Sequence, residues 1–434
     1  MSQQETPDRA RAARPPHGWV QALVAVVAGL VALIATAAIG LWAAGAATLP
    51  AGAFPRVVAA TVVLAVGGTV ELSGDAGPIA GGTSALAVRP LSVTLAGALA
   101  LAAGFLRPLR HRAVVGTREL AGWAARLALL WAVALLALAA FARHTFAVSP
   151  GGTIGELGDL LDAAPTVGFR ADVPRTLVVG LLWLAALLLL SLAVSRTAPL
   201  PARLVRGQQS VRPAASAMVA LLLAWVAVGA VAGLVVAATQ GHPAETFAVI
   251  LLGLPNLVWL AFTLAIGASW DGRVDGPFGL PMPRVLDQVL RTPDGGTVDL
   301  GTLAGHDARV WLLPVLGAAL LLGAAVLLAV RSPAGTPPWR HAVRMAVALV
   351  LTVLIVCAVV TIHAHYGLSL FGIGDLGGGL TAEVTLEPRI WRALGLAALW
   401  GLAAGFLGGP LAAGVHRRGQ VDHPDPSSPE PGRG

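Results

Sequence analysis

The sequence predicts an all-α integral membrane protein, built as a polytopic bundle of transmembrane helices. Hydrophobic residues make up 56% of the 434 residues, whereas charged residues make up only 12%. Soluble domains usually carry about a quarter charged residues, so this composition excludes a soluble globular fold. Long apolar stretches also recur along the chain, and most approach the roughly 20 residues that a helix needs to cross the hydrocarbon core.

Eight apolar stretches predict spanning helices. They are residues 19–44, 91–105, 120–141, 176–194, 215–238, 310–330, 343–362 and 391–415. Two further stretches, 57–70 and 247–266, contain helix-breaking residues and predict broken or re-entrant segments. The first ends in Gly67-Gly68, and the second contains Pro255-Asn256.

The distribution of arginine predicts the orientation of these helices. All 29 basic residues are arginine, and eight crossings place 17 of them on one side of the membrane with six acidic residues. The other side then receives eleven arginines and 16 acidic residues, with Arg126 left inside a span. Because cytoplasmic loops next to spans are rich in basic residues, we expect both termini to lie in the cytoplasm.

The order of the stretches indicates an internal duplication. Ile-Gly-Glu-Leu-Gly at 154–158 precedes Pro174-Arg175, and Ile-Gly-Asp-Leu-Gly at 373–377 precedes Pro388-Arg389. We therefore expect two parallel repeats, 18–196 and 213–416, related by an axis along the membrane normal. A basic linker at 197–212 joins them, and the polar tails 1–17 and 417–434 are expected to be disordered and cytoplasmic. The alternative is that helices rich in Ala, Leu and Val resemble one another by composition alone.

The interrupted stretches are the first candidate site. Breaks at corresponding places in two halves are typical of transport sites, because unwound backbone and half-helix ends bind ions or polar groups. Gly67, Gly68, Pro255 and Asn256 are the candidates for such a transport or gating site. In the alternative interpretation, these segments are shallow hairpins that seal the surface of the bundle.

Ionisable residues near the spans complete the candidate site. A charge deep in the membrane is tolerated mainly for function. Glu71 is the carboxylate that could lie at depth, and its alternative is a solvated loop position. Arg126 and Arg344 fall at matching places early in matching helices, where a long side chain can instead extend to the cytoplasmic face.

No other motif in the sequence predicts a catalytic, metal-binding or nucleic-acid-binding site. Gly-Ile-Gly-Asp at 372–375 matches a string of intramembrane aspartyl proteases, but no span supplies the second aspartate that such an enzyme needs. His363 and His365 lack a third metal ligand nearby in the sequence. The arginines are dispersed through short loops, so nucleic acid binding is not expected. We therefore expect no enzyme activity, no cofactor and no metal.

Several N-terminal motifs carry a resemblance to a known family. The motifs are Gly-Trp at 18–19, Gly-Leu-Trp-Ala-Ala-Gly-Ala at 40–46, Gly-Ala-Phe-Pro at 52–55, Val-Gly-Gly-Thr-Val-Glu-Leu-Ser-Gly at 66–74 and Pro-Leu-Ser-Val-Thr-Leu at 90–95. They resemble the streptophobe family, the polytopic membrane proteins of Streptomyces and related actinobacteria. The resemblance implies an inner-membrane protein without assigned catalytic residues. Leu-Pro-Asn-Leu-Val-Trp at 254–259 also resembles PerM-like cell-division membrane proteins, but the chain continues with a single Gly267 instead of their glycine-rich segment.

Together these observations favour a non-enzymatic membrane protein that scaffolds or regulates envelope processes. Its expected partners are the lipid bilayer and envelope proteins. The alternative is a permease-like transporter with its site at the broken segments of the two repeats.

Overall fold

The fold is taken from a computed structural model of the chain. It describes residues 18–49, 52–75, 80–86, 89–111, 116–147, 166–195, 202–239, 241–275, 290, 296–333, 336–366, 369–370 and 382–413. The tails, both copies of the Ile-Gly-Glu/Asp-Leu-Gly motif and the Gly-Ile-Gly-Asp string lie outside these residues.

Within the described residues, eight helices are long and apolar enough to cross a membrane. They are α1 (Trp19–Ala43), α4 (Thr117–Phe141), α6 (Val173–Val194), α7 (Ala202–Thr239), α8 (Pro243–Ala265), α11 (Leu312–Arg331), α12 (Pro338–Val360) and α13 (Ile390–Ala413). The predicted helical membrane bundle is confirmed. Helix α7 begins at Ala202, inside the segment predicted as a linker.

The set of long helices differs from the predicted set in one member. Helix α3 (Leu91–Leu106), predicted to span, has only 16 residues. Its Gly97 packs against Leu33 and its Gly104 against Ala25, so α3 follows the first half of α1 away from the sheet. Helix α8, predicted to be broken, is continuous and has 23 residues.

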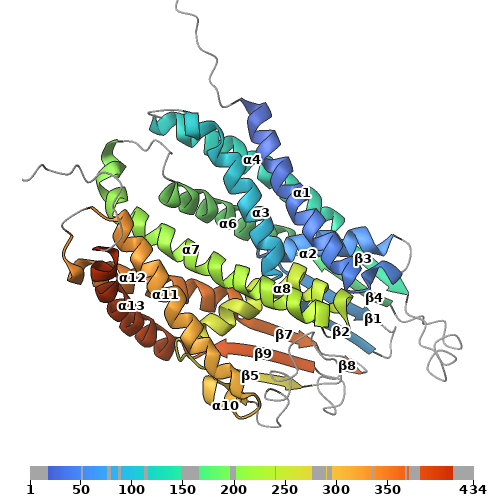
Figure 1. Ribbon diagram of the computed structural model, residues 1–434. Coiled ribbons are helices and arrows are strands. Elements are labelled where there is room, and N and C mark those ends of the chain that lie inside the picture. Colours follow the sequence, from blue (N-terminus) through green and yellow to red (C-terminus); the bar gives the residue numbers. More distant parts are fainter. Residues whose placement is uncertain are drawn as a thin grey trace, which may run out of the picture.

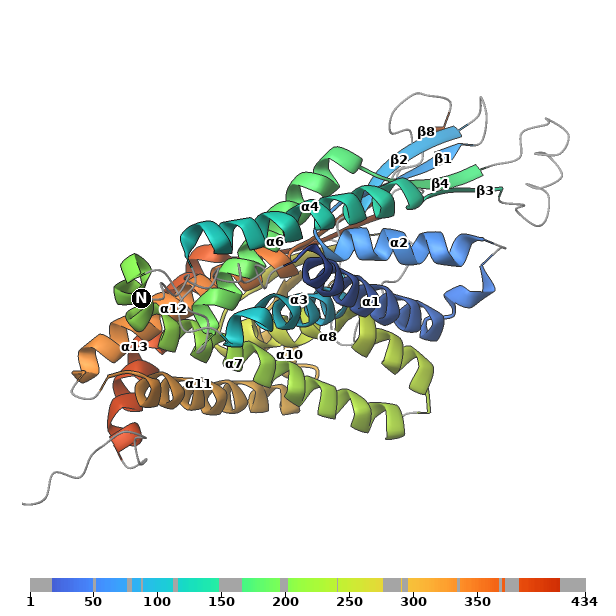
Figure 2. The ribbon, with the colours of Figure 1, turned by 90° about the horizontal axis from the view of Figure 1, so that it is seen from above.

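A nine-stranded sheet covers one end of the bundle, and the sequence reasoning did not foresee it. Its strands are β1 (Val70–Asp75), β2 (Ala80–Leu86), β3 (Arg143–Ala147), β4 (Thr166–Ala171), β5 (Trp270–Asp275), β6 (Gly296–Val298), β7 (Ile362–Tyr366), β8 (Ser369–Leu370) and β9 (Ala382–Pro388). The order is β3-β4-β1-β2-β7-β9-β5-β6, with β8 beside β2, and the pairings are antiparallel. Helix α1 begins at the far end of the bundle, away from the sheet (Figure 1), and strands project beyond the helices at the sheet end (Figure 2).

Helices α2 (Ala53–Ala65) and α8 occupy corresponding places in the two halves. Each begins where the preceding long helix reaches the sheet end, and each leads directly into a strand (Figure 1). The last turn of α2 contacts Thr94 in the first turn of α3, and the last residue of α8 packs on Gly317 of α11. Both helix ends therefore lie within the bundle, and the chain returns from there to the sheet.

The helices and the sheet share their cores. In the first half, Val63 of α2, Val70 of β1 and Ala139 of α4 belong to one buried cluster. In the second half, Trp270 of β5 and Leu386 of β9 belong to the same cluster as Phe262 of α8. Because buried side chains are shared across the boundary, the sheet is anchored in the bundle and does not form a separate domain.

The two halves agree in the register of their strands. Val70 of β1 lies opposite Ala171 of β4, and the equivalent Trp270 of β5 lies opposite Pro388 of β9. This pairing makes Arg392 the equivalent of Arg175. The predicted match of Pro174-Arg175 with Pro388-Arg389 is therefore wrong by three residues, because Pro174 lies in the first turn of α6, whereas Pro388 is the last residue of β9.

Buried positions also recur between matching helices. In α4 these are Trp123, Leu127, Trp131, Leu135 and Ala139, and at one constant spacing α12 buries His341, Met345, Leu349, Val353 and Cys357. The same spacing relates Arg126 to Arg344. The duplication stays a prediction, and these matches in burial and register support it.

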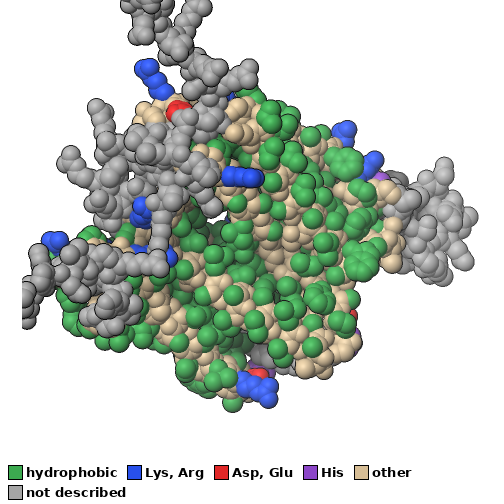
Figure 3. Space-filling model, turned by 45° about the horizontal axis from the view of Figure 1, so that its top comes forward, with side chains coloured by type: hydrophobic (Ala, Val, Ile, Leu, Met, Phe, Trp, Pro, Cys, Tyr) green, Lys and Arg blue, Asp and Glu red, His purple; other side chains and the backbone are tan. Residues whose placement is uncertain are grey.

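The outer faces of the bundle are apolar. Leu182 of α6, Val315 of α11 and Leu399 of α13 expose 64%, 67% and 65% of their surfaces. Figure 3 shows hydrophobic side chains over much of the visible surface, with few charged groups among them. A lipid bilayer is the solvent that suits such a surface.

Candidate functional site

The first candidate residues, Gly67 and Gly68, end helix α2. Gly67 has a φ of +89°, and the amide of Gly68 donates to the carbonyl of Val63 at 2.9 Å. This is a Schellman cap, in which a left-handed residue turns the chain and satisfies the last carbonyls of a helix. Gly68 leaves no room for a side chain, because a Cβ there would lie 2.6 Å from the Thr176 hydroxyl.

The matching cap in the second half is at Gly267. Gly267 has a φ of +91°, and the amide of Ala268 donates to the carbonyl of Thr263 at 3.0 Å. The second break therefore lies at Gly267-Ala268, after the position that the sequence predicted. By the same correspondence, Pro255-Asn256 matches Pro55-Arg56 at the start of α2, and not Gly67-Gly68.

Pro255 does not interrupt α8, because α3 repairs the helix around it. The hydroxyl of Ser92 donates to the carbonyl of Ile250 at 2.7 Å and accepts from the amide of Leu254 at 3.1 Å. Neighbouring side chains commonly satisfy the backbone groups that a proline frees in a membrane helix.

Asn256 connects α8 to the start of α3. Its amide oxygen accepts from the backbone N–H of Leu91 at 3.1 Å, and its amide nitrogen donates to the carbonyl of Arg89 at 2.9 Å. The oxygen thus caps the N-terminus of α3, which otherwise leaves its first amides without partners. Arg89 also donates to the carbonyl of Ala358 in α12 at 3.3 Å. We refer to Arg89, Ser92, Ile250, Leu254 and Asn256, with their hydrogen bonds, as the α3–α8 seam.

The predicted site residues are only partly brought together. A Cβ on Gly67 would lie 4.0 Å from Nε of Arg89, so the first glycine pair and Asn256 approach the same arginine. Arg126 lies instead against Trp19, the first residue of α1, with its guanidinium carbon 5.9 Å from the ring centre. Arg344 lies in the second turn of α12, also in the half of its helix away from the sheet.

Glu71 lies on the surface of the sheet. Its carboxylate is 3.5 Å from the Arg170 guanidinium, and the two side chains expose 54% and 74% of their surfaces. The alternative prediction, a solvated position, therefore fits Glu71 better than the prediction of a carboxylate deep in the membrane. Val70, the residue before it, is buried, so the side chains alternate between core and solvent as in a strand with one exposed face.

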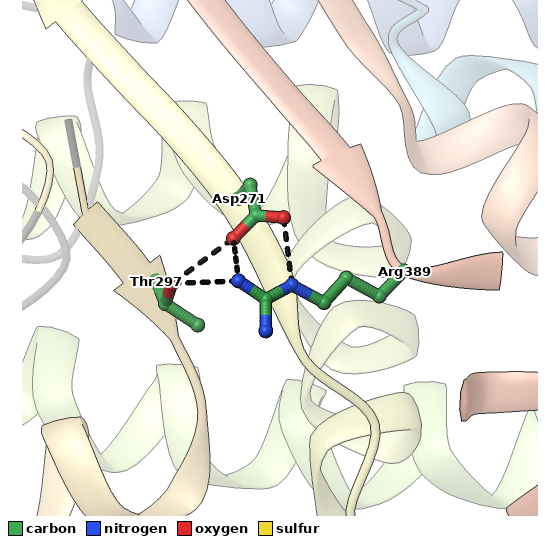
Figure 4. Close-up of polar contacts among 3 residues, drawn as sticks. All are labelled: Asp271, Thr297 and Arg389. Carbon is green, nitrogen blue, oxygen red and sulfur yellow. Dashed lines mark hydrogen bonds and ion pairs between the residues drawn. The ribbon is translucent and has the colours of Figure 1, made fainter. Parts of the chain in front are cut away.

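A stronger ion pair occupies the corresponding place in the second half (Figure 4). Asp271 of β5 accepts from Nε and Nη2 of Arg389 at 2.8 and 2.9 Å, and Thr297 of β6 donates to Asp271 at 3.0 Å. The hydrogen bonds from Arg389 lower the pKa of the Asp271 carboxyl. Bidentate geometry of this kind fixes the orientation of both groups. Sequence reasoning missed this site because its three residues come from segments far apart in the chain.

The described residues contain no group of three or more His, Cys, Asp or Glu that could hold a metal ion. The strand β7 contains His363 and His365, whose side chains lie outside the described part of the structure. A cavity of about 330 Å³ adjoins α2 and is apolar. Its lining residues are Ile34, Ala38, Phe54, Pro55, Val58, Ala59, Leu138 and Phe141.

No known protein family, curated protein or solved structure matches this chain. Its function must therefore be argued from the geometry of its own residues.

Proposed function

We propose that this protein is a non-enzymatic membrane scaffold that presents its sheet to envelope proteins. The observation that carries the proposal is the α3–α8 seam. The side-chain amide of Asn256 uses its oxygen and its nitrogen on Leu91 and Arg89, and the hydroxyl of Ser92 both donates and accepts within the chain. Polar groups committed to such bonds are not free to exchange a hydration shell with a transported solute.

The sheet supplies the surface that a scaffold needs. It joins both halves, and its side facing away from the core carries the pairs Glu71–Arg170 and Asp271–Arg389. Membership of the streptophobe family, suggested by the N-terminal motifs, stays a prediction and agrees with a protein of this kind.

Permease-like transport is the alternative, and one observation favours it. Helices α2 and α8 both end against other helices of the bundle before the chain turns back to the sheet, and helices that end within the membrane are typical of many transporters. Transport requires water to reach the α3–α8 seam from both sides of the membrane, which separates the two functions experimentally.

The test is thiol labelling from each side of the membrane. Cys357, the single cysteine, is replaced by alanine, and one cysteine is introduced as Asn256→Cys or Ser92→Cys. Ala244→Cys and Gly116→Cys, both at exposed positions near opposite ends of the bundle, are the accessible controls. Folding of each variant is checked by gel filtration.

We expect each control to react with a membrane-impermeant reagent from one side, and the two seam cysteines to react from neither. Reaction of both seam cysteines from both sides would show a solvent pathway and replace the scaffold by a transporter.

A further inference from the structure

The two halves of the chain meet through unlike strands. Ala85 and Leu86 of β2 pair with His365 and Ala364 of β7. Along the sheet, the first half therefore contributes its last strand and the second half its first. An interface that uses different surfaces on two similar units is heterologous, and such an interface leaves one copy of each surface unused at the two ends.

The register identifies the strands that carry these unused surfaces. His144 of β3 lies opposite Phe169 of β4, as Ile362 of β7 lies opposite Leu386 of β9, so β3 corresponds to β7. Leu86 lies opposite Val70, as Val298 lies opposite Trp270, so β6 corresponds to β2. Among the strands that the structure describes, β3 and β6 are the two edges of the sheet.

We propose that β6 of one copy pairs with β3 of a second copy, head to tail, as β2 pairs with β7 within one chain. Thr297 of β6 corresponds to Ala85 of β2, and Ala147 of β3 corresponds to His365 of β7. Because Ala85 lies opposite His365 within the chain, the same register predicts that Thr297 of one copy lies opposite Ala147 of the other. An open edge carries unpaired N–H and C=O groups, and adding a strand satisfies them.

The helices beside the two sheet edges, β3 and β6, also carry surfaces that correspond to the contact between the halves. Within the chain, the first residue of α3, Leu91, is 4% exposed because it packs against α8. The corresponding start of α11 exposes large apolar side chains, since Trp311, Leu312 and Val315 are 58%, 66% and 67% exposed. Among the described residues, no helix of the first half packs extensively on α11, whereas α8 of the second half covers the start of α3.

The first half carries an apolar surface against which the start of α11 of a second copy can pack. Helix α2 corresponds to α8, and the apolar cavity of about 330 Å³ lies beside its start, with Phe54, Pro55 and Val58 in the wall. Pro55 corresponds to Pro255, which lies at the α3–α8 seam. A second copy fits this place because its α11 presents apolar side chains to an apolar cavity, continuing the interface already formed between the halves.

Disulfide crosslinking between two tagged copies tests the proposal, which does not depend on the scaffold function. Two proteins are made in the Cys357→Ala background, one with Thr297→Cys and one with Ala147→Cys. Each carries a different affinity tag, and the two are expressed together in the same membranes. Residues directly opposite in an antiparallel pair have Cα atoms about 4.5 to 5.5 Å apart, which a disulfide spans.

We expect a crosslinked species that carries both tags, and no crosslinking when either variant is expressed alone. Thr297→Cys expressed with Gly116→Cys, at the far end of the bundle, is the negative control. The proposal fails if the mixed pair crosslinks no more than this control although both cysteines react with a small thiol reagent. It also fails if either single variant crosslinks to itself, because that contact would be isologous.

A second pair of variants tests the helix contact. Trp311→Ala should lower the yield of the mixed crosslink severalfold. Trp391→Ala removes another exposed tryptophan, 87% exposed at the start of α13, and should leave the yield unchanged. Equal yields from both variants would exclude the start of α11 from the interface.

Discussion

The side chain of Asn256 illustrates how one residue joins two helices from different halves. We expect Asn256→Leu to lower the free energy of unfolding in detergent by about 2 kcal/mol, because it leaves a donor and an acceptor of the α3 start without partners. Asn256→Asp retains an acceptor for Leu91 but turns its second oxygen towards the carbonyl of Arg89 and adds a charge within the bundle, so it should be no more stable than Asn256→Leu. Thermal unfolding followed by circular dichroism measures the difference, and equal stability of all three proteins would contradict this role.

The ion pair of Asp271 and Arg389 predicts a dependence of stability on pH. The pKa of Asp271 is lowered in the folded protein, so the stabilisation is complete above the ordinary aspartate pKa of about 3.9 and is lost as the pH falls through the lowered value. We expect the melting temperature of the wild type to fall more steeply than that of Asp271→Asn between about pH 5 and pH 2. Parallel curves for the two proteins would show that the pair does not stabilise the fold. Both side chains are half exposed, so the difference between the curves should be small.

At the scale of single elements, the two Schellman caps offer a matched comparison. Gly67→Ala and Gly267→Ala each place a side chain on a residue with positive φ, which costs about 1 kcal/mol or more. A Cβ at Gly67 would lie 2.8 Å from Val179, whereas one at Gly267 would lie 3.4 Å from Leu396. We therefore expect Gly67→Ala to be the more destabilising variant in a thermal unfolding assay. The reverse order would mean that Val179 moves more easily than this packing implies.

The contact between α12 and α13 depends on glycine. A Cβ at Gly401 would lie 2.5 Å from the Cα of Ala346, so the backbones of the two helices approach closely. Gly401→Val should force the helices apart and lower the yield of folded protein in gel filtration. Gly395→Val is the matched control, because nothing lies within 4 Å of its Cβ position, and it should behave as the wild type does. Similar losses from both variants would point to helix propensity as the cause instead of packing.

Sequence reasoning was sound for the long helices and weaker for short elements. Apolar length alone identifies helices such as α1 and α12, because the bilayer requires that length. The sequence prediction misplaced the break in α8. The hydroxyl of Ser92, in a helix of the other half, bonds the backbone of Ile250 and Leu254 beside Pro255, and the sequence does not reveal this contact. The prediction missed the sheet for a related reason, since the partner of β1 on one side, β4, is far away in the sequence.

The candidate site was foreseen in its components but not in its geometry. The spacing of Gly67 and Asn256 in the chain does not reveal that both approach Arg89, since only the packing of α2, α3 and α8 brings them together. The resemblance of Gly67-Gly68 to Pro255-Asn256 as breaks was misleading, because a glycine ends a helix by its φ angle, whereas a proline can lie inside one when neighbours supply the missing bonds.

As a whole, the molecule is a helical membrane bundle with the α3–α8 seam between its halves and one continuous sheet at one end. Helices α1, α4, α7 and α12 bring the chain to the sheet end (Figure 1). The short helix α3 and the helices α6, α11 and α13 return it to the far end, as Figure 1 also shows. The arginine bias predicts that the sheet lies outside the cytoplasm, where envelope proteins can reach it. This sidedness is the central claim, because a sheet on the cytoplasmic side could not act on the envelope.

The most direct measurement is the labelling of Thr297→Cys in intact cells, in the Cys357→Ala background, with a membrane-impermeant thiol reagent. Thr297 lies on edge strand β6 and is partly exposed. The account predicts labelling of Thr297→Cys without permeabilisation, and labelling of Gly116→Cys only after the membrane is opened. Labelling in the opposite order would place the sheet in the cytoplasm and contradict the proposed function.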